Sequence, residues 1–313
     1  MSNSIPSDRT YDVLSVGELL ADFISTNLAE DIAHADEFRR FPGGSPANLA
    51  RNLAVLGKQA ALVATVGDDG LGRYLVRELT DSGVNTEHVA IHPTRPTSAV
   101  LIARSTETPD FIHYRQADTD IGHGRMPESL VRDCRIFHTT CVALSSDEAR
   151  PSILEAARRA AESGGHLSID ANYARPHWKT PESARLAIKS YCRGTTLLKL
   201  SMDDAERIFE DRDIDPGFVI ESLHRWGAWL VCLTLGANGS RVSWKGGEEH
   251  AFVEAEAVDE VHGATGAGDA FWSGFLTGWL DGQTPAQCAD IGSRVAARKV
   301  RVPGPLTSAP AMK

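Results

Sequence analysis

Between residues 136 and 170 the chain reads IFHTTCVAL (136–144), SSDEAR (145–150), PSILEAARRAAESGG (151–165) and HLSID (166–170). The first and last segments are short runs of apolar and β-branched residues, which is typical of buried strands. The segment at 151–165 repeats its apolar residues at helical spacing and ends on two glycines. A strand, a helix and a second strand in this order predict a βαβ unit with two parallel strands.

The same alternation continues on both sides of this unit. The further strand-like runs are 61–66, 197–200 and 229–235, and the further helical patterns are 71–83, 181–191, 203–210 and a segment near 216–226. Repeated alternation of this kind predicts an α/β fold, with a mostly parallel sheet and helices on both faces. Ligands of such sheets bind at the carboxyl ends of the strands.

Two segments interrupt the alternation. Residues 10–43 contain YDVLSVGELLADFIS and then a polar stretch, and residues 95–118 suggest a strand, a turn and a strand. We expect the outer parts of both segments to form a small β-sheet lid that projects from the main sheet. Because the chain has no internal repeat and no low-complexity linker, one domain over residues 1–313 is preferred to two independent domains.

Composition excludes several classes of partner. The net charge is -10, and the 32 lysines and arginines are scattered, which argues against a nucleic-acid surface. The first residues, MSNSIPSDRT, lack the apolar core of a signal peptide, and no apolar run reaches membrane-spanning length, so a cytoplasmic protein without a membrane partner is predicted. The odd number and wide spacing of the cysteines predict buried thiols: Cys134, Cys141, Cys192, Cys232 and Cys288.

The stretch 261-VHGATGAGDAFWSGF-275 predicts a helix that begins near Gly266 and has a wide apolar face. A helix start presents unpaired N–H groups and a positive dipole end, so the bare backbone at 266–268 allows the close approach of a phosphate, with Asp269 beside it. The alternative interpretation is a flexible turn in which Asp269 only stabilises the start of the helix.

The stretch 42-PGGSPANLARNLAVLG-57 predicts a second helix, with Ser45 as its N-cap, Pro46 at the first helical position and Gly57 at its end. Asn48 then lies in the first turn, beside the space that the preceding glycines leave. Taken alone, this pattern also fits a purely structural turn and cap. Asp22 follows an apolar strand, where an isolated aspartate is commonly a turn residue.

Two common nucleotide motifs are missing from the sequence. It has no GxxxxGK[ST], which removes the P-loop as an explanation of phosphate binding. The stretch GDDGLG at 67–72 has its glycines in the wrong order for a dinucleotide-binding turn, which argues against a Rossmann dehydrogenase.

Together, GGSPANLARNLAVLG (43–57) and TGAGDAFWSGF (265–275) resemble the two signatures of the PfkB (ribokinase-like) carbohydrate kinase family. The remaining matches occur in the family's order: GELLADF (17–23), VGDDGLGRYL (66–75), DANYARPHW (170–178), SMDDAE (201–206) and TLGANG (234–239). The resemblance therefore covers nearly the whole chain. It implies phosphorylation of a sugar hydroxyl by ATP, with a β lid over the sugar.

The resemblance also implies roles for individual residues. Asp269 matches the family's catalytic base, and the backbone of Gly266, Ala267 and Gly268 matches its anion hole. The positions that match contacts to sugar hydroxyls are Asp22, Gly43, Gly44 and Asn48. Arg115 matches the lid arginine of members similar to fructokinase and 2-keto-3-deoxygluconate kinase, and the alternative interpretation is a solvated arginine.

On the nucleotide side, the resemblance implies binding by Ser201, Thr234, Gly236, Gly239 and Gly268. Locally, the pair at 238–239 is also a good hairpin turn. The family often has Asn-x-x-Glu where this chain has Ser201 and Asp204, and a carboxylate one methylene shorter still reaches Mg²⁺ through water. Gly263 and Ala264 stand where many members have Asp-Thr, which puts a monovalent-cation site in doubt.

The favoured function is an ATP- and Mg²⁺-dependent, fructokinase-like sugar kinase acting on fructose or a related ketohexose, because Asp22 suits a neutral polyhydroxy substrate. A 2-keto-3-deoxygluconate kinase is the alternative, because Arg115 suits a carboxylate. A nucleoside kinase and a non-catalytic sugar-binding relative are less favoured. The resemblance also favours a homodimer joined through the lid, where pairing would cover an exposed strand edge.

Overall fold

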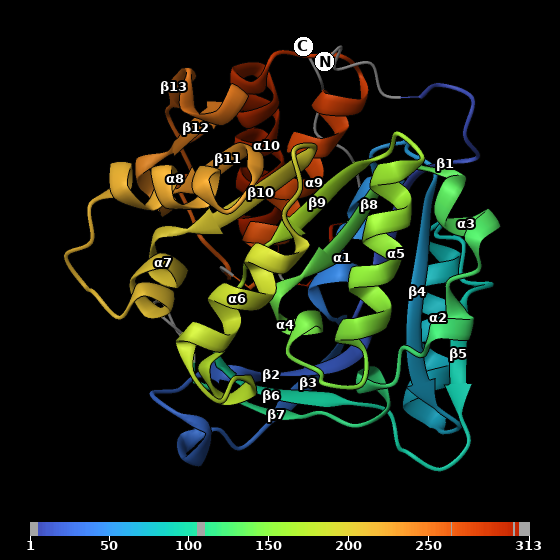
Figure 1. Ribbon diagram of the computed structural model, residues 1–313. Coiled ribbons are helices and arrows are strands. Elements are labelled where there is room, and N and C mark those ends of the chain that lie inside the picture. The colour runs from blue at the N-terminus through green and yellow to red at the C-terminus, as the bar shows by residue number, and fades with distance from the viewer. Residues whose placement is uncertain (1–5, 105–109, 264, 303, 307–313) are drawn as a thin grey trace.

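The computed structural model describes residues 6–104, 110–263, 265–302 and 304–306. Within these ranges the main sheet has nine strands, in the order β13-β12-β11-β10-β9-β8-β1-β4-β5 (Figure 1). The strands are β1 (Tyr11–Val16), β4 (Ala60–Gly67), β5 (Val89–His92), β8 (Cys134–Thr140), β9 (His166–Asp170), β10 (Thr196–Ser201), β11 (Ala228–Thr234), β12 (Ser240–Trp244) and β13 (Glu249–Val253). Neighbours from β5 to β11 are parallel, and only the two pairings beyond β11 are antiparallel. The prediction of a mostly parallel sheet is confirmed.

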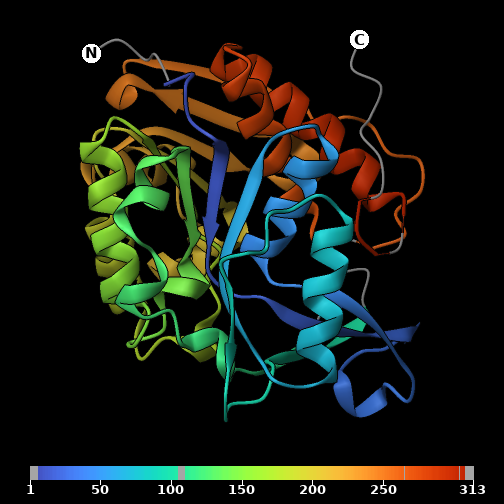
Figure 2. The same ribbon diagram turned by 90° about the vertical axis from the view of Figure 1, so that its right-hand side faces the viewer.

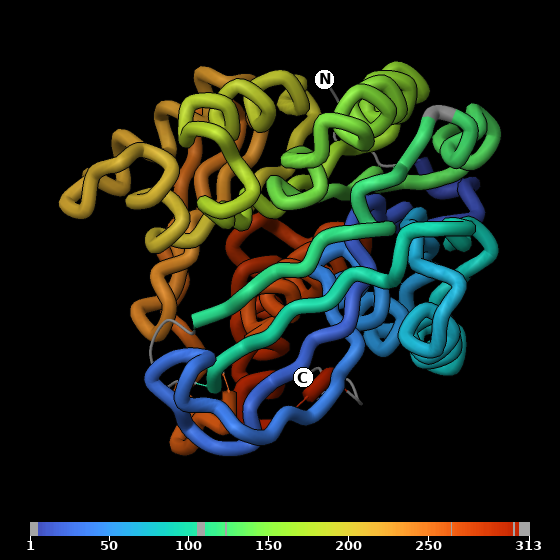
Figure 3. The backbone as a smooth tube through the Cα atoms, turned by 90° about the horizontal axis from the view of Figure 1, so that it is seen from below, coloured from blue at the N-terminus to red at the C-terminus, as the bar shows by residue number. Residues whose placement is uncertain are grey.

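A second sheet, called the lid sheet below, lies across one end of the main sheet (Figures 1 and 3). Its strands are β2 (Leu20–Leu28), β3 (Phe38–Gly43), β6 (Ala99–Arg104) and β7 (Phe111–Tyr114), in the order β3-β2-β6-β7. In Figure 3 these blue and green strands cross the view, with the red C-terminal helices behind them. The two strands predicted within 95–118 correspond to β6 and β7, which pair in antiparallel fashion, whereas the predicted turn falls on residues 105–109, outside the described ranges.

Helices cover both faces of the main sheet, as Figure 2 shows. One face carries α1 (Ser45–Val55), α2 (Gly70–Asp81), α9 (Ala267–Leu280) and α10 (Pro285–Val300). The other carries α3 (Glu128–Arg132), α4 (Cys141–Leu144), α5 (Arg150–Glu162), α6 (Pro181–Tyr191), α7 (Met202–Phe209) and α8 (Pro216–Arg225). Short 3-10 turns are η1 (Ile32–His34), η2 (Ala117–Thr119), η3 (His123–Arg125), η4 (Arg175–His177), η5 (Gly236–Asn238) and η6 (Lys245–Gly247). Side chains alternate along each strand, so Ile136 packs toward the first layer and its neighbour Phe137 toward the second.

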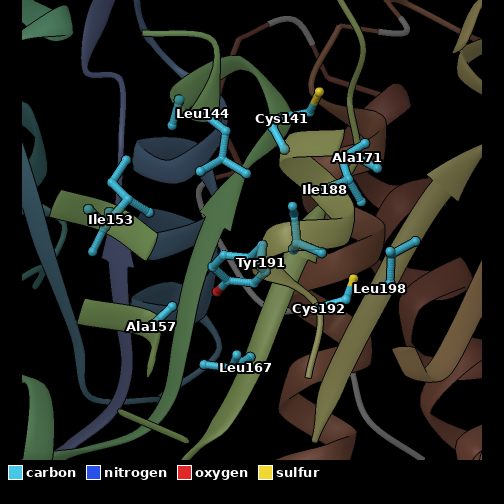
Figure 4. Close-up of a cluster of buried hydrophobic side chains, with 14 of the residues drawn as sticks. Cys141, Leu144, Ile153, Ala157, Leu167, Ala171, Ile188, Tyr191, Cys192 and Leu198 are labelled. Carbon is cyan, nitrogen blue, oxygen red and sulfur yellow. The ribbon is translucent and has the colours of Figure 1, made fainter. Parts of the chain in front are cut away.

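The larger core fills the space between the main sheet and the α5–α6 layer. Figure 4 shows side chains of these helices gathered over the strands, with Tyr191 near the centre. The buried Tyr191 hydroxyl lies 3.0 Å from the carbonyl oxygens of both Phe137 and Ser168. All five cysteines are buried and free, which confirms that they are not paired as disulfides.

Two local predictions were wrong. Residues 141–144 continue the predicted strand in sequence, yet they form α4, because Thr140 caps this turn by accepting a hydrogen bond from the Ala143 N–H at 3.0 Å. Ser45 is not the N-cap of α1. Gly44 holds that position with a φ of 97°, so Ser45 is the first helical residue and Pro46, predicted to be the first, is the second. In the described parts of the chain, no helix combines the length and apolar character needed to cross a membrane.

Candidate active site

A cavity of about 650 Å³ lies between the lid sheet and the start of α9. Alternate residues of the lid strands face it, for example Leu20, Asp22 and Ile24 from β2. This pattern follows from strand geometry, because every second side chain points to the same face of a sheet. The helix starts supply Ser45 and Asn48 on one side and Gly266 and Asp269 on the other.

Asp269 lies in the first turn of α9 and is held by two donors from α1. The Ser45 hydroxyl donates to its Oδ1 at 2.6 Å, and the Asn48 amide donates to its Oδ2 at 2.9 Å. The hydroxyl that was expected to cap α1 therefore orients a carboxylate 224 residues away in sequence. Asn48, predicted to contact sugar hydroxyls, lines the cavity and also restrains Asp269.

The surroundings of Asp269 weaken its acidity. Burial, assisted by the negative charge of Asp170, raises the pKa of Asp269 to about 6, while the hydrogen bonds from Ser45 and Asn48 act in the opposite direction. A carboxyl group with this pKa is ionised near neutral pH and is still basic enough to accept a proton.

Asp22 is a second buried carboxylate in the same cavity. Burial and the negative charge of Asp269 raise the pKa of Asp22 to about 7. Within the described residues, no group donates a hydrogen bond to its side chain. Gly43 lies directly against it, since a Cβ built on Gly43 would fall 2.3 Å from the Asp22 carboxyl carbon. The site thus presents one restrained carboxylate and one with free acceptor capacity, which suits a ligand with several hydroxyl groups.

The start of α9 is the candidate anion site. Gly266 is the N-cap in the left-handed conformation, with a φ of 78°, and it makes no side-chain capping hydrogen bond. The N–H groups of the first turn have no intrahelical partner and therefore remain available to an anion. The three residues predicted to form the anion hole differ in their positions. Gly266 lines the cavity, Ala267 begins the helix, and Gly268 packs against Lys199.

Lys199 and Asp170 form a buried ion pair that the sequence analysis missed. The Lys199 ammonium lies 2.9 and 3.1 Å from the two carboxylate oxygens of Asp170. A Cβ on Gly268 would approach the same ammonium to 2.8 Å, so a larger residue there would have to displace the end of the lysine side chain. The available signal was a lysine inside the apolar strand LLKL, because an unpaired charge is rarely buried.

Arg115 does not line the cavity. Its guanidinium donates to the Asp118 carboxylate at 2.7 Å, to the Val142 carbonyl at 2.9 Å and to the Ser145 hydroxyl at 2.7 Å. A second contact of 2.6 Å completes the ion pair with the buried Asp118. The predicted lid arginine is therefore occupied by internal partners.

The cations that do line the cavity are different ones. They are Arg39, Arg51, Arg104 and Lys299. Arg51 follows Asn48 by one turn of α1, and in the described part of the chain its buried Nε and Nη1 have no hydrogen-bond partner. Arg51 and Lys299 carry no sequence signal for this role, because each lies in an ordinary helical pattern without a motif of its own.

The residues predicted to bind the nucleotide lie at the ends of two adjacent strands. Ser201 ends β10 and pairs in register with Thr234, which ends β11. Beyond them, Gly236 and Gly239 both have positive φ, at 59° and 92°. A Cβ on Gly239 would fall 2.2 Å from the Val253 carbonyl oxygen, so this turn needs glycine. None of these residues lines the described cavity.

Asp204 was predicted to reach Mg²⁺ through water. Its Oδ2 accepts from Ser201 at 2.6 Å and its Oδ1 from the Tyr173 N–H at 3.2 Å. A carboxylate has about four acceptor positions, so Asp204 retains capacity for a metal-bound water, and its residue type fits Mg²⁺. No cluster of three metal-ligating side chains occurs in the described ranges. Gly263 lines the cavity, whereas Ala264, the other altered cation-site position, lies outside the described residues.

Comparison with known proteins extends these observations. Residues 10–312 match the family described as pfkB family carbohydrate kinase. The ATP-dependent 6-phosphofructokinase of Thermoanaerobacterium thermosaccharolyticum is 36% identical over 97% of this chain and 92% of that protein. The probable fructokinase-2 of Arabidopsis thaliana is 32% identical over 87% of this chain and 82% of that protein. Among solved structures, Halothermothrix orenii fructokinase is 33% identical with a TM-score of 0.77, covering 90% of this chain and 96% of that one.

Proposed function

Because the chain belongs to the pfkB family of carbohydrate kinases and is an ATP-dependent phosphotransferase, we propose that its substrate is fructose or a related ketohexose. The observation that carries this proposal is Asp22, whose buried carboxylate faces the cavity and accepts no side-chain or backbone hydrogen bond from any described residue. A neutral polyol supplies such donors, whereas an anionic group beside Asp22 would be repelled. The names of the fructokinase relatives point to the same class of substrate.

In the proposed reaction, Asp269 accepts the proton of the attacking sugar hydroxyl. The hydroxyl oxygen forms a bond to the γ-phosphorus of ATP, the bond between that phosphorus and the β–γ bridging oxygen breaks, and ADP leaves. The N–H groups at the start of α9, from Gly266 to Gly268, stabilise the negative charge on the transferring phosphoryl group. Gly44 and Asn48 orient the sugar from the start of α1, while Gly43 leaves room for the Asp22 carboxylate.

The nucleotide is assigned to the strand-end residues Ser201, Thr234, Gly236 and Gly239. Asp204 would hold Mg²⁺ through water, and the metal ion would supply charge neutralisation of the phosphates. Since Gly263 lacks a carboxylate, we propose at most weak activation by potassium. We also propose that all 313 residues form one kinase domain and that it acts in the cytoplasm, where free buried thiols are stable. Neither a membrane nor a nucleic acid is proposed as a partner.

A second candidate substrate is fructose 6-phosphate. One relative is named for that activity, and Arg39, Arg51 and Arg104 line the cavity. The unpartnered guanidinium atoms of Arg51 would suit a phosphate on the far end of the sugar. By contrast, the internal pairing of Arg115 removes the main argument for a sugar acid such as 2-keto-3-deoxygluconate.

Coupled measurement of ADP release separates these candidates. Initial rates would be compared for fructose, fructose 6-phosphate, 2-keto-3-deoxygluconate and a nucleoside, with and without Mg²⁺. We expect the highest kcat/KM on fructose, and we expect Arg51→Met to leave that value within about threefold, because a neutral sugar presents no charge to the guanidinium. The exposed Arg77 of α2 provides a matched control, Arg77→Met.

A preference for fructose 6-phosphate, with a loss of about tenfold or more in Arg51→Met on that substrate alone, would replace fructose by the second candidate. Such a loss corresponds to about 1.4 kcal/mol in transition-state binding. Absence of ADP release with every sugar, despite measurable sugar binding, would instead support a non-catalytic sugar-binding protein.

A further inference from the structure

Lys299 lies in the last turn of α10, and its side chain projects toward the start of α9. The residue is only 8% exposed, and it lines the cavity together with Gly266 and Asp269. Its Cε lies 3.4 Å from the position that a Cβ on Gly266 would occupy. Within the described ranges, no carboxylate forms an ion pair with it and no acceptor receives a hydrogen bond from its ammonium.

This arrangement differs from that of the other buried lysine. Lys199 is neutralised by Asp170, at 2.9 Å. Burial lowers the pKa of Lys299, and the negative charge of Asp269 acts in the opposite direction. Asp269 itself is already occupied by Ser45 and Asn48. A buried ammonium without a close counter-ion is unfavourable, and an incoming anion would remove that cost.

A role limited to the end of α10 does not account for this geometry. Basic side chains stabilise helix ends by lying beside the last carbonyl groups, usually at the surface. The Lys299 side chain instead reaches a different helix, at the end where N–H groups are unpaired and the dipole is positive. Two independent sources of positive charge thus converge beside Asp269.

We propose that Lys299 is a further catalytic residue, whose ammonium contacts the phosphoryl group during its transfer and completes the anion site formed by the backbone of residues 266–268. The ammonium keeps its proton throughout. It contributes a fixed positive charge, while Asp269 takes the hydroxyl proton. This inference depends on phosphoryl transfer at this site and holds for either candidate sugar.

The first test is kinetic, with Lys299→Met as the main variant, since methionine retains much of the volume without the charge. Loss of one preorganised group at a developing charge lowers kcat by about 10²–10³-fold, and we expect a decrease in that range. The KM of the sugar should change by less than about threefold. Lys189→Met, at an exposed position of α6, is the matched control and should behave as wild type. A Lys299→Met enzyme with more than half of the wild-type kcat would overturn the proposal.

The second test does not depend on turnover. Calorimetric titration would compare the affinities of ADP and of a non-hydrolysable ATP analogue for the wild type and for Lys299→Met. A charge-assisted contact to the terminal phosphate predicts about a tenfold or greater loss for the analogue, with ADP affected much less. Equal losses for both nucleotides, or none, would contradict the assignment. Retained ADP binding also shows that the variant is folded.

A third variant tests the ammonium group itself. Lys299→Ala leaves a space of the size of propylammonium. We expect this ion to raise the kcat of the variant at least tenfold, with a saturable dependence on its concentration. Tetramethylammonium at the same ionic strength serves as the control, because it has no N–H donor. If both ions act equally, the effect is one of ionic strength and the proposal fails.

Discussion

Asp269 illustrates how a few contacts define a single residue's chemistry. Its two oxygens accept from Ser45 and Asn48, so the carboxylate has one orientation with respect to the cavity. Replacement by asparagine keeps the shape and removes the proton acceptor. We expect Asp269→Asn to lower kcat by about 10²–10⁴-fold, the usual range for loss of a general base.

Sugar binding should survive in Asp269→Asn, and equilibrium titration with the sugar checks this independently of turnover. The exposed Asp290 of α10 supplies a control, Asp290→Asn, with unchanged kinetics. If Asp269→Asn retained more than about a tenth of wild-type kcat, another group would have to be the base.

The pH dependence of kcat follows from the same carboxylate. Because burial raises the pKa of Asp269 to about 6, the active, ionised form is lost as the pH falls through about 6. The hydrogen bond from Ser45 lowers the pKa of Asp269, so Ser45→Ala should move the acid limb of the kcat profile to higher pH. The change in kcat at pH 8 should be smaller. Rate profiles from pH 5 to 9 measure the shift. An unchanged or oppositely shifted limb would contradict the role of Ser45.

Asp22 is expected to lower the stability of the folded protein although it is proposed to bind the sugar. Its pKa in the folded state is about 7, above the ordinary value of 3.8, so the folded chain holds the proton more tightly than the unfolded chain. The free energy of unfolding therefore decreases as the pH rises from about 4 to about 7. Asp22→Asn should stabilise the protein at pH 8 by about 1–3 kcal/mol, since one pKa unit corresponds to about 1.4 kcal/mol.

Urea unfolding of Asp22→Asn and the wild type at pH 8 and pH 4.5 tests this sign. The stabilisation should shrink at the lower pH, where Asp22 is protonated in the folded protein. The same variant should lose sugar affinity. A destabilised variant at pH 8 would mean that Asp22 has a favourable partner in the folded state.

Among the elements, the turn between β11 and β12 offers a matched pair of glycines. Gly236 and Gly239 both have positive φ, but a Cβ on Gly236 meets open space whereas one on Gly239 meets the Val253 carbonyl oxygen at 2.2 Å. Gly236→Ala should cost about 1–2 kcal/mol from backbone strain alone. Gly239→Ala should cost about 2–4 kcal/mol, because overlap is added to strain.

Chemical unfolding of both alanine variants measures this difference. If the turn also holds the nucleotide, as proposed, ADP affinity should fall more in Gly239→Ala than in Gly236→Ala. Equal losses of stability in the two variants would show that β13 shifts to make room.

For the whole molecule, the outer face of the lid sheet is the expected dimer surface. The side chains that alternate with the cavity-facing ones include Ile112 and Tyr114, which are 41% and 53% exposed. The edges of this sheet are β3 and β7, and unpaired edges are usually covered in some way. We predict a homodimer in solution. Ile112→Glu should convert it to a monomer, as measured by light scattering after size exclusion.

Leu186→Glu is the control for that prediction, because Leu186 is 56% exposed on α6, which is not part of the lid sheet. A monomeric wild type, or equal effects of both variants, would exclude the lid surface as the interface.

Much of the architecture could be predicted from the sequence, because its causes are local. The strand-like runs from 61 to 235 and the helical patterns between them depend on the spacing of apolar residues along the chain. The glycine-rich helix starts at 43–57 and 265–275 are equally local, so the segments that meet at the cavity were identified. Prediction of the local structure failed at 141–144, where the Thr140 side chain caps a helical turn in place of a continued strand.

The partners of the polar side chains are determined by long-range packing, which the spacing of residues along the chain does not predict. Ser45 has the residue type of an N-cap, yet it holds Asp269 because α1 and α9 begin beside each other. Arg115 matched a ligand-binding position, yet its guanidinium pairs with the buried Asp118, which forms no second ion pair within the described residues. Lys299 had no recognisable pattern at all. Burial and distance assign such roles, since the strength of a charge or hydrogen bond depends on how completely folding removes water around it.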